Sequence, residues 1–432
     1  MFYRRYFRYS KGILLYVLLT IAVLTACGQE QDSGQKTSNH GIEELVMDEG
    51  IQTREDTLGD NNGGNAESVT VEEGTAESVK EVGMAGEVPK TEETDESKEL
   101  RKRFGNKCIA EQTFEAELSE YDGKVWFVPF APSTTEGFHM QIMQNEKVLT
   151  NIRAYVPEEL EKEKFVNLDA VAFFDVNFDN ATDIVLIETY GNTSFAVVYY
   201  GEVYTYSDGD VSVSFYAEEN LSDHVTSTAD TLTIPVIRDF LGNGKRNGEY
   251  TDYREAYIAV SKLREMESNG EDEYAMIYFD DDDIPELVAD HPGYHVSMYT
   301  YHDGRIYTLM NQWGYGAGGN HGYEYCPRKG SVRNYDADYA GLILYTTYWE
   351  LGDRYQLDHV VSIKFLNFID ANGNGLPDGD ENETAGYGDK SYVGDVEITW
   401  EEESSYSAGE YEWLGSGANG MNFEELTAAL SE

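Results

Sequence analysis

Positive charge is scarce in this chain. It has 31 lysines and arginines against 81 aspartates and glutamates, so the 432 residues carry a formal net charge of −50. Such a surface repels phosphates, which excludes a nucleic-acid partner and disfavours electrostatic docking on anionic lipid. Self-repulsion of this size destabilises a compact state, and bound divalent cations would relieve part of it.

Cysteine is nearly absent as well. The three cysteines, Cys27, Cys108 and Cys326, form no Cys-x-x-Cys motif and no Cys/His cluster. This spacing argues against a zinc site and against a redox role. The sequence leaves open whether Cys108 and Cys326 pair.

Motifs for catalysis are missing too. There is no Gly-x-Ser-x-Gly and no His-Glu-x-x-His. Gly314–Gly319 has the G-x-G-x-x-G spacing, but no helical pattern follows it, as a dinucleotide-binding fold requires. An enzyme is therefore the less favoured interpretation. A carbohydrate-active hydrolase with paired carboxylates remains the alternative, although 61 acidic residues after Leu100 offer too many pairs to choose from.

The apolar run near the start is too short to span a bilayer comfortably. It covers the thirteen residues Gly12–Leu24. The residues before it include Arg4, Arg5, Arg8 and Lys11, and Leu-Thr-Ala-Cys stands at 24–27. A basic segment, a short apolar segment and small residues before a cleavage point are typical of a secretory signal. An ordinary signal peptide and a short anchor helix are the two simpler interpretations.

The segment 24–27 resembles the lipobox of bacterial lipoproteins. The resemblance implies that residues 1–26 are a signal peptide cleaved before Cys27 and that the Cys27 thiol is lipidated. The mature protein would then be anchored to the cell membrane by lipid, outside the cytoplasm.

A long acidic segment follows. Between Gly28 and Leu100 there are 20 acidic and 5 basic residues and no Trp, Phe or Tyr. Such a composition cannot offset the entropy cost of ordering, so we expect a disordered acidic linker over residues 27–104. Like charges extend a linker, which suits a spacer between the membrane and a domain. An acidic tail that binds a partner is the alternative.

Residues 105–432 have the composition of a folded domain, with a possible internal boundary near 240–270. Nearly all aromatic residues lie here, and the net charge of residues 101–432 is −39. Alternating β-branched and aromatic residues with Asp-Gly turns predict strands, for example over 195–206, 296–309 and 392–400. One helix is predicted after a capping box at Asp252–Glu255, and a short one over about 422–430. The fold class is mainly β with one or two helices.

Three stretches are variants of one oxygen-lined loop. The fullest runs from Asp370 to Glu381, with oxygen-bearing side chains at loop positions 1, 3, 5, 9 and 12 and Gly375 at position 6. This is the D-x-[DN]-x-[DN]-G-x5-E pattern of a Ca²⁺ loop. Its candidate ligands are Asp370, Asn372, Asn374, Asp378 and Glu381.

The other two loops are less complete. One begins at Asp175, and the other has Tyr278 in place of the first acidic residue. The candidate Ca²⁺ ligands are Asp175, Asn177, Asp179 and Asp183 in the former and Asp280, Asp282 and Glu286 in the latter. In all three loops the simpler interpretation is a surface turn rich in Asp, Asn and Gly.

Residues 174–185 resemble the FG-GAP/VCBS repeat, and residues 279–288 a related version in surface lipoproteins of gut Firmicutes. The 370–381 loop is similar to dockerin, EF-hand-like and thrombospondin type-3 loops. The resemblance implies a Ca²⁺-bound loop between two strands at the edge of a propeller blade. The three loops start 103 and 92 residues apart, which is more than one blade, so we expect a partial or irregular propeller.

A glycine-rich loop near residue 315 has aromatic neighbours. Trp313, Tyr315, His321 and Tyr323 could form a ligand surface, for sugar among others, or the loop could pack on itself.

Together these patterns predict a lipid-anchored extracytoplasmic protein. Its Ca²⁺ loops would stabilise a β-rich domain that binds an extracellular glycan or protein or has a structural role. A place in an export or envelope assembly is a further alternative.

Overall fold

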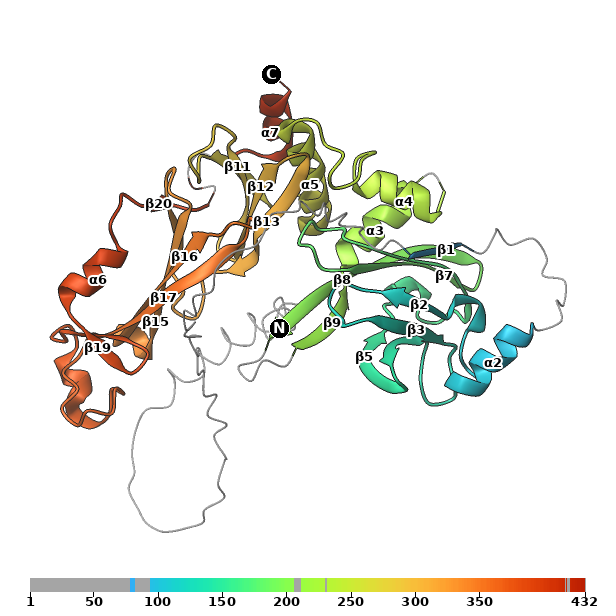
Figure 1. The fold of residues 1–432 in the computed structure, drawn as a ribbon, viewed down its shortest axis with the longest axis horizontal. Coiled ribbons are helices and arrows are strands. Elements are labelled where there is room, and N and C mark those ends of the chain that lie inside the picture. Colours follow the sequence, from blue (N-terminus) through green and yellow to red (C-terminus); the bar gives the residue numbers. More distant parts are fainter. Residues whose placement is uncertain are drawn as a thin grey trace, which may run out of the picture. The chain divides into compact units, whose positions relative to one another are not determined.

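The computed structural model (Figure 1) describes residues 78–81, 94–205, 211–229, 231–415, 417 and 420–431. The predicted signal segment, Cys27 and most of the predicted linker lie outside these ranges. Among the described residues, no helix has the length and apolar character needed to cross a membrane.

The described part is β-rich, as the sequence predicts, and consists of four antiparallel sheets without a closed barrel. The first sheet holds β2 (Phe114–Glu117), β3 (Lys124–Phe130), β4 (His139–Gln144) and β5 (Lys147–Arg153). The second holds β6 (Phe165–Phe174), β7 (Asp183–Tyr190), β8 (Thr193–Thr205) and β9 (Val211–Ala217), with β1 (Ser78–Glu81) on its edge. The third holds β10 (Glu273–Ile277), β11 (Glu286–His291), β12 (His295–His302) and β13 (Arg305–Gly314).

The fourth sheet is the largest, and its strand order is β19-β18-β17-β16-β15-β14-β20. Its strands are β14 (Gly322–Cys326), β15 (Ser331–Asp338), β16 (Ile343–Leu351), β17 (Leu357–Leu366), β18 (Lys390–Val393), β19 (Val396–Ile398) and β20 (Glu412–Trp413). In the first three sheets the strands follow one another in chain order, so each contains a four-stranded meander.

The second sheet is buried on both faces. Successive side chains of a strand point to opposite faces. On β7, Ile184 and Leu186 accordingly join a core shared with the first sheet, whereas Val185 and Ile187 join a core shared with the helices and the third sheet. All four are buried. The opposite face of the third sheet packs on the fourth sheet.

Helices separate the second and third sheets. The core between these sheets includes α3 (Glu219–Thr228), α4 (Ile234–Leu241), α5 (Tyr253–Ser268) and α7 (Phe423–Leu430). The meanders therefore succeed one another along the chain as propeller blades do, but the second and third do not stack directly.

Both predicted helices are present. Helix α5 begins after Asp252, whose side chain accepts the N–H of Arg254 at 2.7 Å, but Glu255 binds Thr251 instead of closing the predicted capping box. Helix α7 begins with a complete capping box between Asn422 and Glu425.

Four further α-helices lie in the described residues. They are α2 (Asp95–Phe104), α3, α4 and α6 (Trp400–Tyr406); short 3₁₀ turns span Ala110–Gln112, Glu158–Leu160, Tyr339–Gly341 and Gly379–Thr384. Helix α3 has no side-chain cap, and its buried face against β8 stabilises it in place of a local signal.

Helix α2 lies inside the segment predicted to be a disordered linker. Thr94 caps it, two acidic residues begin it and three basic residues end it, which suits the helix dipole. Leu100 is buried, and the guanidinium of Arg103 lies 4.7 Å from the Trp126 ring. The folded part therefore begins earlier than the sequence predicts, because this packing partner is not visible in a local composition.

Cys108 and Cys326 do not pair. Both are buried free thiols. The Cys108 sulfur lies 3.1 Å from the Thr113 hydroxyl, and burial raises the pKa of the Cys108 thiol. The described domain therefore folds without a disulfide.

One carboxylate in the core shared by the first and second sheets leads to a prediction about how stability depends on pH. Glu188 is fully buried, and neither of its oxygens has a hydrogen-bond partner of normal geometry, although the Tyr190 hydroxyl is close. Burial raises the pKa of Glu188 well above its usual range. The core accommodates Glu188 best when its carboxyl group is protonated. Its contribution to the free energy of unfolding is therefore complete below pH 4.5, its ordinary pKa, and is lost as the pH rises through the folded-state pKa.

We therefore expect Glu188→Gln to raise the free energy of unfolding at pH 8 by about 1 to 3 kcal/mol, because the uncompensated charge is removed. Urea denaturation between pH 4 and 9 measures this, and the gain should shrink toward pH 4. Glu115→Gln, at an exposed position of β2, controls for the loss of one charge. A gain that does not change with pH would contradict the prediction.

Candidate functional site: three acidic loops

Each of the three acidic loops joins two antiparallel neighbours. The 175–183 loop connects β6 to β7, the 278–286 loop connects β10 to β11, and the 370–381 loop lies between β17 and β18. In the first two loops the last candidate ligand, Asp183 or Glu286, is also the first residue of the following strand. The strand-loop-strand arrangement expected from the sequence is thus present in all three.

The three loops share one hydrogen-bond scaffold. The side-chain oxygen at position 3 accepts the backbone N–H of position 5, at 3.3, 3.0 and 2.8 Å in chain order. The oxygen at position 5 accepts the N–H of position 7, at 2.8, 2.7 and 2.8 Å. These are Asx turns, in which Asp and Asn side chains take over backbone bonds. Positions that align in the three sequences therefore make equivalent hydrogen bonds in the structure.

Position 6 holds glycine in the 370–381 loop but asparagine in the 175–183 loop. Asn180 at this position has φ 64°, close to the φ 72° of Gly375 in the 370–381 loop. This is the left-handed region, which asparagine tolerates better than other residues with a side chain. Asn180 therefore replaces the turn glycine without changing the path of the loop.

In the 175–183 loop, Asp183 is completely buried. Its two oxygens accept the N–H of Val176 at 2.7 Å and of Gly201 at 2.9 Å, so this carboxylate connects the start of the loop to β8. Asp175 accepts the N–H groups of Asp179 and Asn180, both at 3.2 Å.

The acidic residues of this loop carry charge at a high cost. Burial first, and then the charge of Asp179, raise the pKa of Asp175 to about 8. Burial raises the pKa of Asp179 as well, and burial followed by Asp179 and Asp175 raises the pKa of Asp183 well above its usual range. Buried carboxylates that repel one another are stabilised as anions by a cation placed between them.

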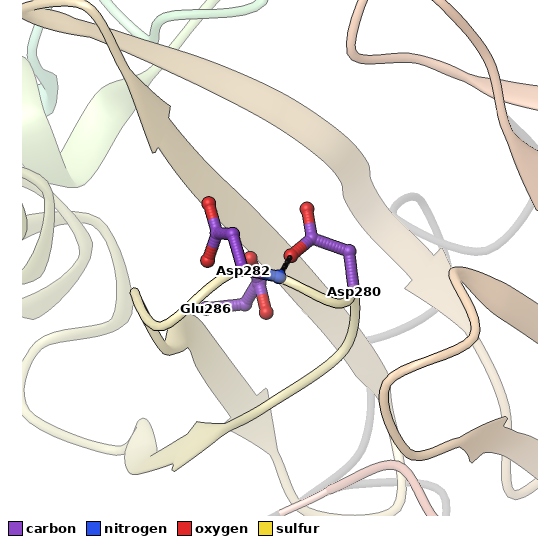
Figure 2. A group of neighbouring side chains, drawn as sticks. All are labelled: Asp280, Asp282 and Glu286. Carbon is purple, nitrogen blue, oxygen red and sulfur yellow. Dashed lines mark hydrogen bonds between the residues drawn. The ribbon is translucent and has the colours of Figure 1, made fainter.

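The 278–286 loop brings three carboxyl groups together, as Figure 2 shows. Atoms of Asp280, Asp282 and Glu286 all lie within 4.8 Å of one another, and the described residues form no other group of three His, Cys, Asp or Glu that meets this geometry. Glu286 is fully buried and accepts the N–H of Phe279 at 2.7 Å and the hydroxyl of Thr300 at 3.2 Å. Burial raises the pKa of Glu286 to about 8 and is also the main cause that raises the pKa of Asp280.

The missing first ligand of this loop has been replaced by a different contact. Tyr278 is 46% exposed, and the Arg328 guanidinium lies 4.5 Å from the centre of its ring. The same guanidinium donates to the backbone oxygen of Asp282 at 3.0 Å and lies 3.7 Å from the Asp283 carboxylate. One side of the loop is therefore held by a cation–π and ionic contact.

The 370–381 loop has the fullest sequence match, but it is the most exposed of the three. The amides of Asn372 and Asn374 donate to the two oxygens of Asp378 at 2.9 and 2.8 Å. Glu381 is 8% exposed and accepts the N–H of Ala371 at 2.9 Å. The side chains of the 370–381 loop thus bind one another. An ion bound here would replace these internal hydrogen bonds with contacts to its ligands.

Sequence reasoning missed the groups that reach the 175–183 loop from other sheets. Glu120, between β2 and β3, accepts the N–H of Thr182, and its charge is among the causes that raise the pKa of Asp179. From β13, Asn311 donates to Asp179 at 3.1 Å and Thr308 donates to the backbone oxygen of Phe178 at 2.7 Å. These contacts join residues about 60 and 130 positions apart, and no local pattern predicts them.

The aromatic loop is mostly packed inward. Tyr323 is buried, and the Trp313 ring lies 5.5 Å from it and 5.0 Å from Trp349. Tyr315 packs against the same core, whereas His321 is exposed. Trp313, Tyr315 and Tyr323 therefore pack on the core between the third and fourth sheets, and ligand binding by this loop stays a prediction.

Comparisons of the chain with models of protein families, with curated proteins and with solved structures found no match.

The loop scaffold gives a stability prediction. Asp183→Ala leaves two buried N–H groups without an acceptor, and we expect the free energy of unfolding to fall by about 2 to 6 kcal/mol. Urea denaturation in the presence of a chelator measures the scaffold without any bound ion. Asp353→Ala, at an exposed position, is the matched control. If both variants lose the same stability, the two hydrogen bonds of Asp183 do not hold the loop.

Proposed function

We propose that the acidic loops bind Ca²⁺ and that the bound ions stabilise the β-rich domain of a lipid-anchored extracytoplasmic protein. The observation that carries the proposal is the carboxyl cluster of Asp280, Asp282 and Glu286, whose atoms meet within 4.8 Å. Glu286 is completely buried there with a raised pKa. A hard cation would offset the cost of placing these charges together.

The chemistry of the ligands supports calcium. The candidate ligands in all three loops are carboxylate and amide oxygens, which Ca²⁺ binds with flexible geometry in sets of six to eight. Loops of imperfect sequence bind weakly, in the range that suits the millimolar calcium outside cells. The net charge of −50 favours any divalent cation at the surface. The 278–286 loop is the best-formed of the three sites.

Bound calcium would hold together the two strands that each loop connects. In the first two loops the last ligand is the first residue of the following strand and the other ligands lie in the turn, whereas in the third loop all ligands lie between β17 and β18. An ion there fixes the crossing from strand to strand and neutralises the clustered carboxylates. The domain would then present its surfaces to an extracellular glycan or protein, or serve as a structural module.

We expect Ca²⁺ to raise the thermal midpoint of the chelator-treated protein. At tenfold excess over its dissociation constant, one ion adds about 1.4 kcal/mol, which corresponds to roughly 2 °C in a domain of this size. The double variant Asp280→Asn/Asp282→Asn should lose part of this rise, because two anionic ligands are removed while both oxygens that accept backbone N–H groups remain. Differential scanning calorimetry with and without Ca²⁺ measures both.

Asp281→Asn is the matched control. Asp281 lies between the two ligands but is exposed, so this variant should respond to Ca²⁺ as the wild type does. A wild-type midpoint that is the same in chelator and in excess Ca²⁺ would sink the proposal.

The membrane anchor is tested separately. We expect Cys27→Ser to abolish incorporation of labelled fatty acid and to shift the protein from the membrane fraction to the soluble fraction, because the acylated thiol is gone. Cys108→Ser, which alters a buried thiol, should leave both unchanged. Fatty-acid labelling that persists in Cys27→Ser would show that the lipobox interpretation is wrong.

A further inference from the structure

Positive charge gathers in two pockets of the described residues. One is lined by Lys98, Arg101, Lys102 and Lys107 around the end of α2. The other draws its cations from α4, from the turn after α4 and from β13. It has a volume of about 710 Å³ and lies where the β2–β3 connection, the 175–183 loop, the segment after α4 and the start of β13 meet. Four basic side chains line it, together with only two acidic ones. The basic residues are Arg238, Lys245, Arg246 and Arg305.

The segments that carry these cations are fixed relative to one another. The N–H groups of Gly248 and Tyr250 both donate to the backbone oxygen of Gly304, at 3.0 and 3.3 Å. The Asn247 side chain accepts the N–H of Ile306 at 2.8 Å and donates to its oxygen at 3.1 Å. The turn that carries Lys245 and Arg246 is thereby attached to β13 beside Arg305.

The cations differ in their surroundings. The Arg238 guanidinium lies 4.7 Å from the Phe174 ring, and the Lys245 ammonium pairs with Glu255 at 2.6 Å. Arg305 makes no side-chain hydrogen bond or ion pair with another described residue. Its guanidinium keeps its donors for a ligand, and a planar guanidinium binds carboxylate, sulfate or phosphate through two parallel bonds.

The two acidic lining residues are engaged in other contacts. Glu117 pairs with Lys124 at 3.7 Å, and the Asp175 oxygens accept two backbone N–H groups of their own loop. The sequence of the turn, Gly242-Asn-Gly-Lys245, lacks the remaining residues of a phosphate-binding loop. Its role here is to place cations at the rim of a pocket.

We propose that this pocket binds an anionic ligand, namely a carboxylate, sulfate or phosphate group on a small molecule or at the end of a polymer. The volume lies in the range of small-molecule sites. A bound anion would offset the repulsion between Arg305 and its basic neighbours. Because the chain carries a net charge of −50, most of its surface repels anions, and binding in this pocket depends on these side chains. Anion binding here needs only basic side chains of the protein, so it does not depend on Ca²⁺ in the 175–183 loop.

The test is isothermal titration calorimetry of the whole protein at low salt. The probes are digalacturonate, glucose 6-phosphate, inorganic sulfate and, as the neutral control, cellobiose. We expect at least one anion to bind below about 1 mM and cellobiose not to bind; the anion that binds most tightly identifies the group. Arg305→Gln should weaken that anion at least about tenfold, the loss of one charge-assisted contact.

Arg354→Gln is the matched control, because Arg354 is an exposed cation in the turn between β16 and β17. It should bind the anion as the wild type does. Arg246→Gln, in the exposed turn, gives a second variant should Arg305→Gln fail to fold, and weakened binding is expected there too. The proposal is overturned if no anion binds below about 1 mM, if cellobiose binds as well as the anions, or if the folded pocket variants bind as the wild type does.

Discussion

Buried carboxylates at the start of a strand are the constraint on which this domain depends. Asp183 and Glu286 occupy the same place in two successive meanders, and each accepts, at 2.7 Å, the N–H of the second residue of its loop. The oxygens that remain bind Gly201 and Thr300, which belong to the next strand of the same sheet. Each carboxylate thus connects its own strand both to the loop before it and to the next strand of the sheet. Removing it would leave buried donors unpaired, whereas keeping it buries charge, and the proposed cation would resolve that conflict.

The same constraint links local loops to long-range packing. The 175–183 loop receives Glu120 from the first sheet and Asn311 from the third, so contacts from both sides converge on one turn. The second sheet has no solvent-exposed face, since one side packs on the first sheet and the other on the helices. A turn at the edge of such a sheet affects both cores. Stabilising this turn would therefore stabilise the packing on either side of it.

The features that the sequence predicted correctly depend on residues that are close together in the chain. Alternation and Asp-Gly turns predicted the strands, and the spacing of Asp, Asn and Gly predicted three loops that do share one hydrogen-bond scaffold. The sequence did not predict helix α3, which lacks a cap and depends on β8, nor helix α2, whose acidic surroundings resemble a linker. Glu120 and Arg328 were missed because they reach the loops from distant segments. The fullest motif, at Asp370, is also the most exposed, because matching residues in a sequence do not determine burial.

Residues 421–430 complete the core that contains α5. Met421 pairs with Tyr274 on the edge of the third sheet, and Leu426 and Leu430 of α7 are buried in the core that contains α5. This core therefore stays open on one side until residues 421–430 are in place. A nascent or shortened chain that ends before residue 421 would expose apolar side chains of α5 and β10 to water, and such a chain would be a target for chaperones and proteases.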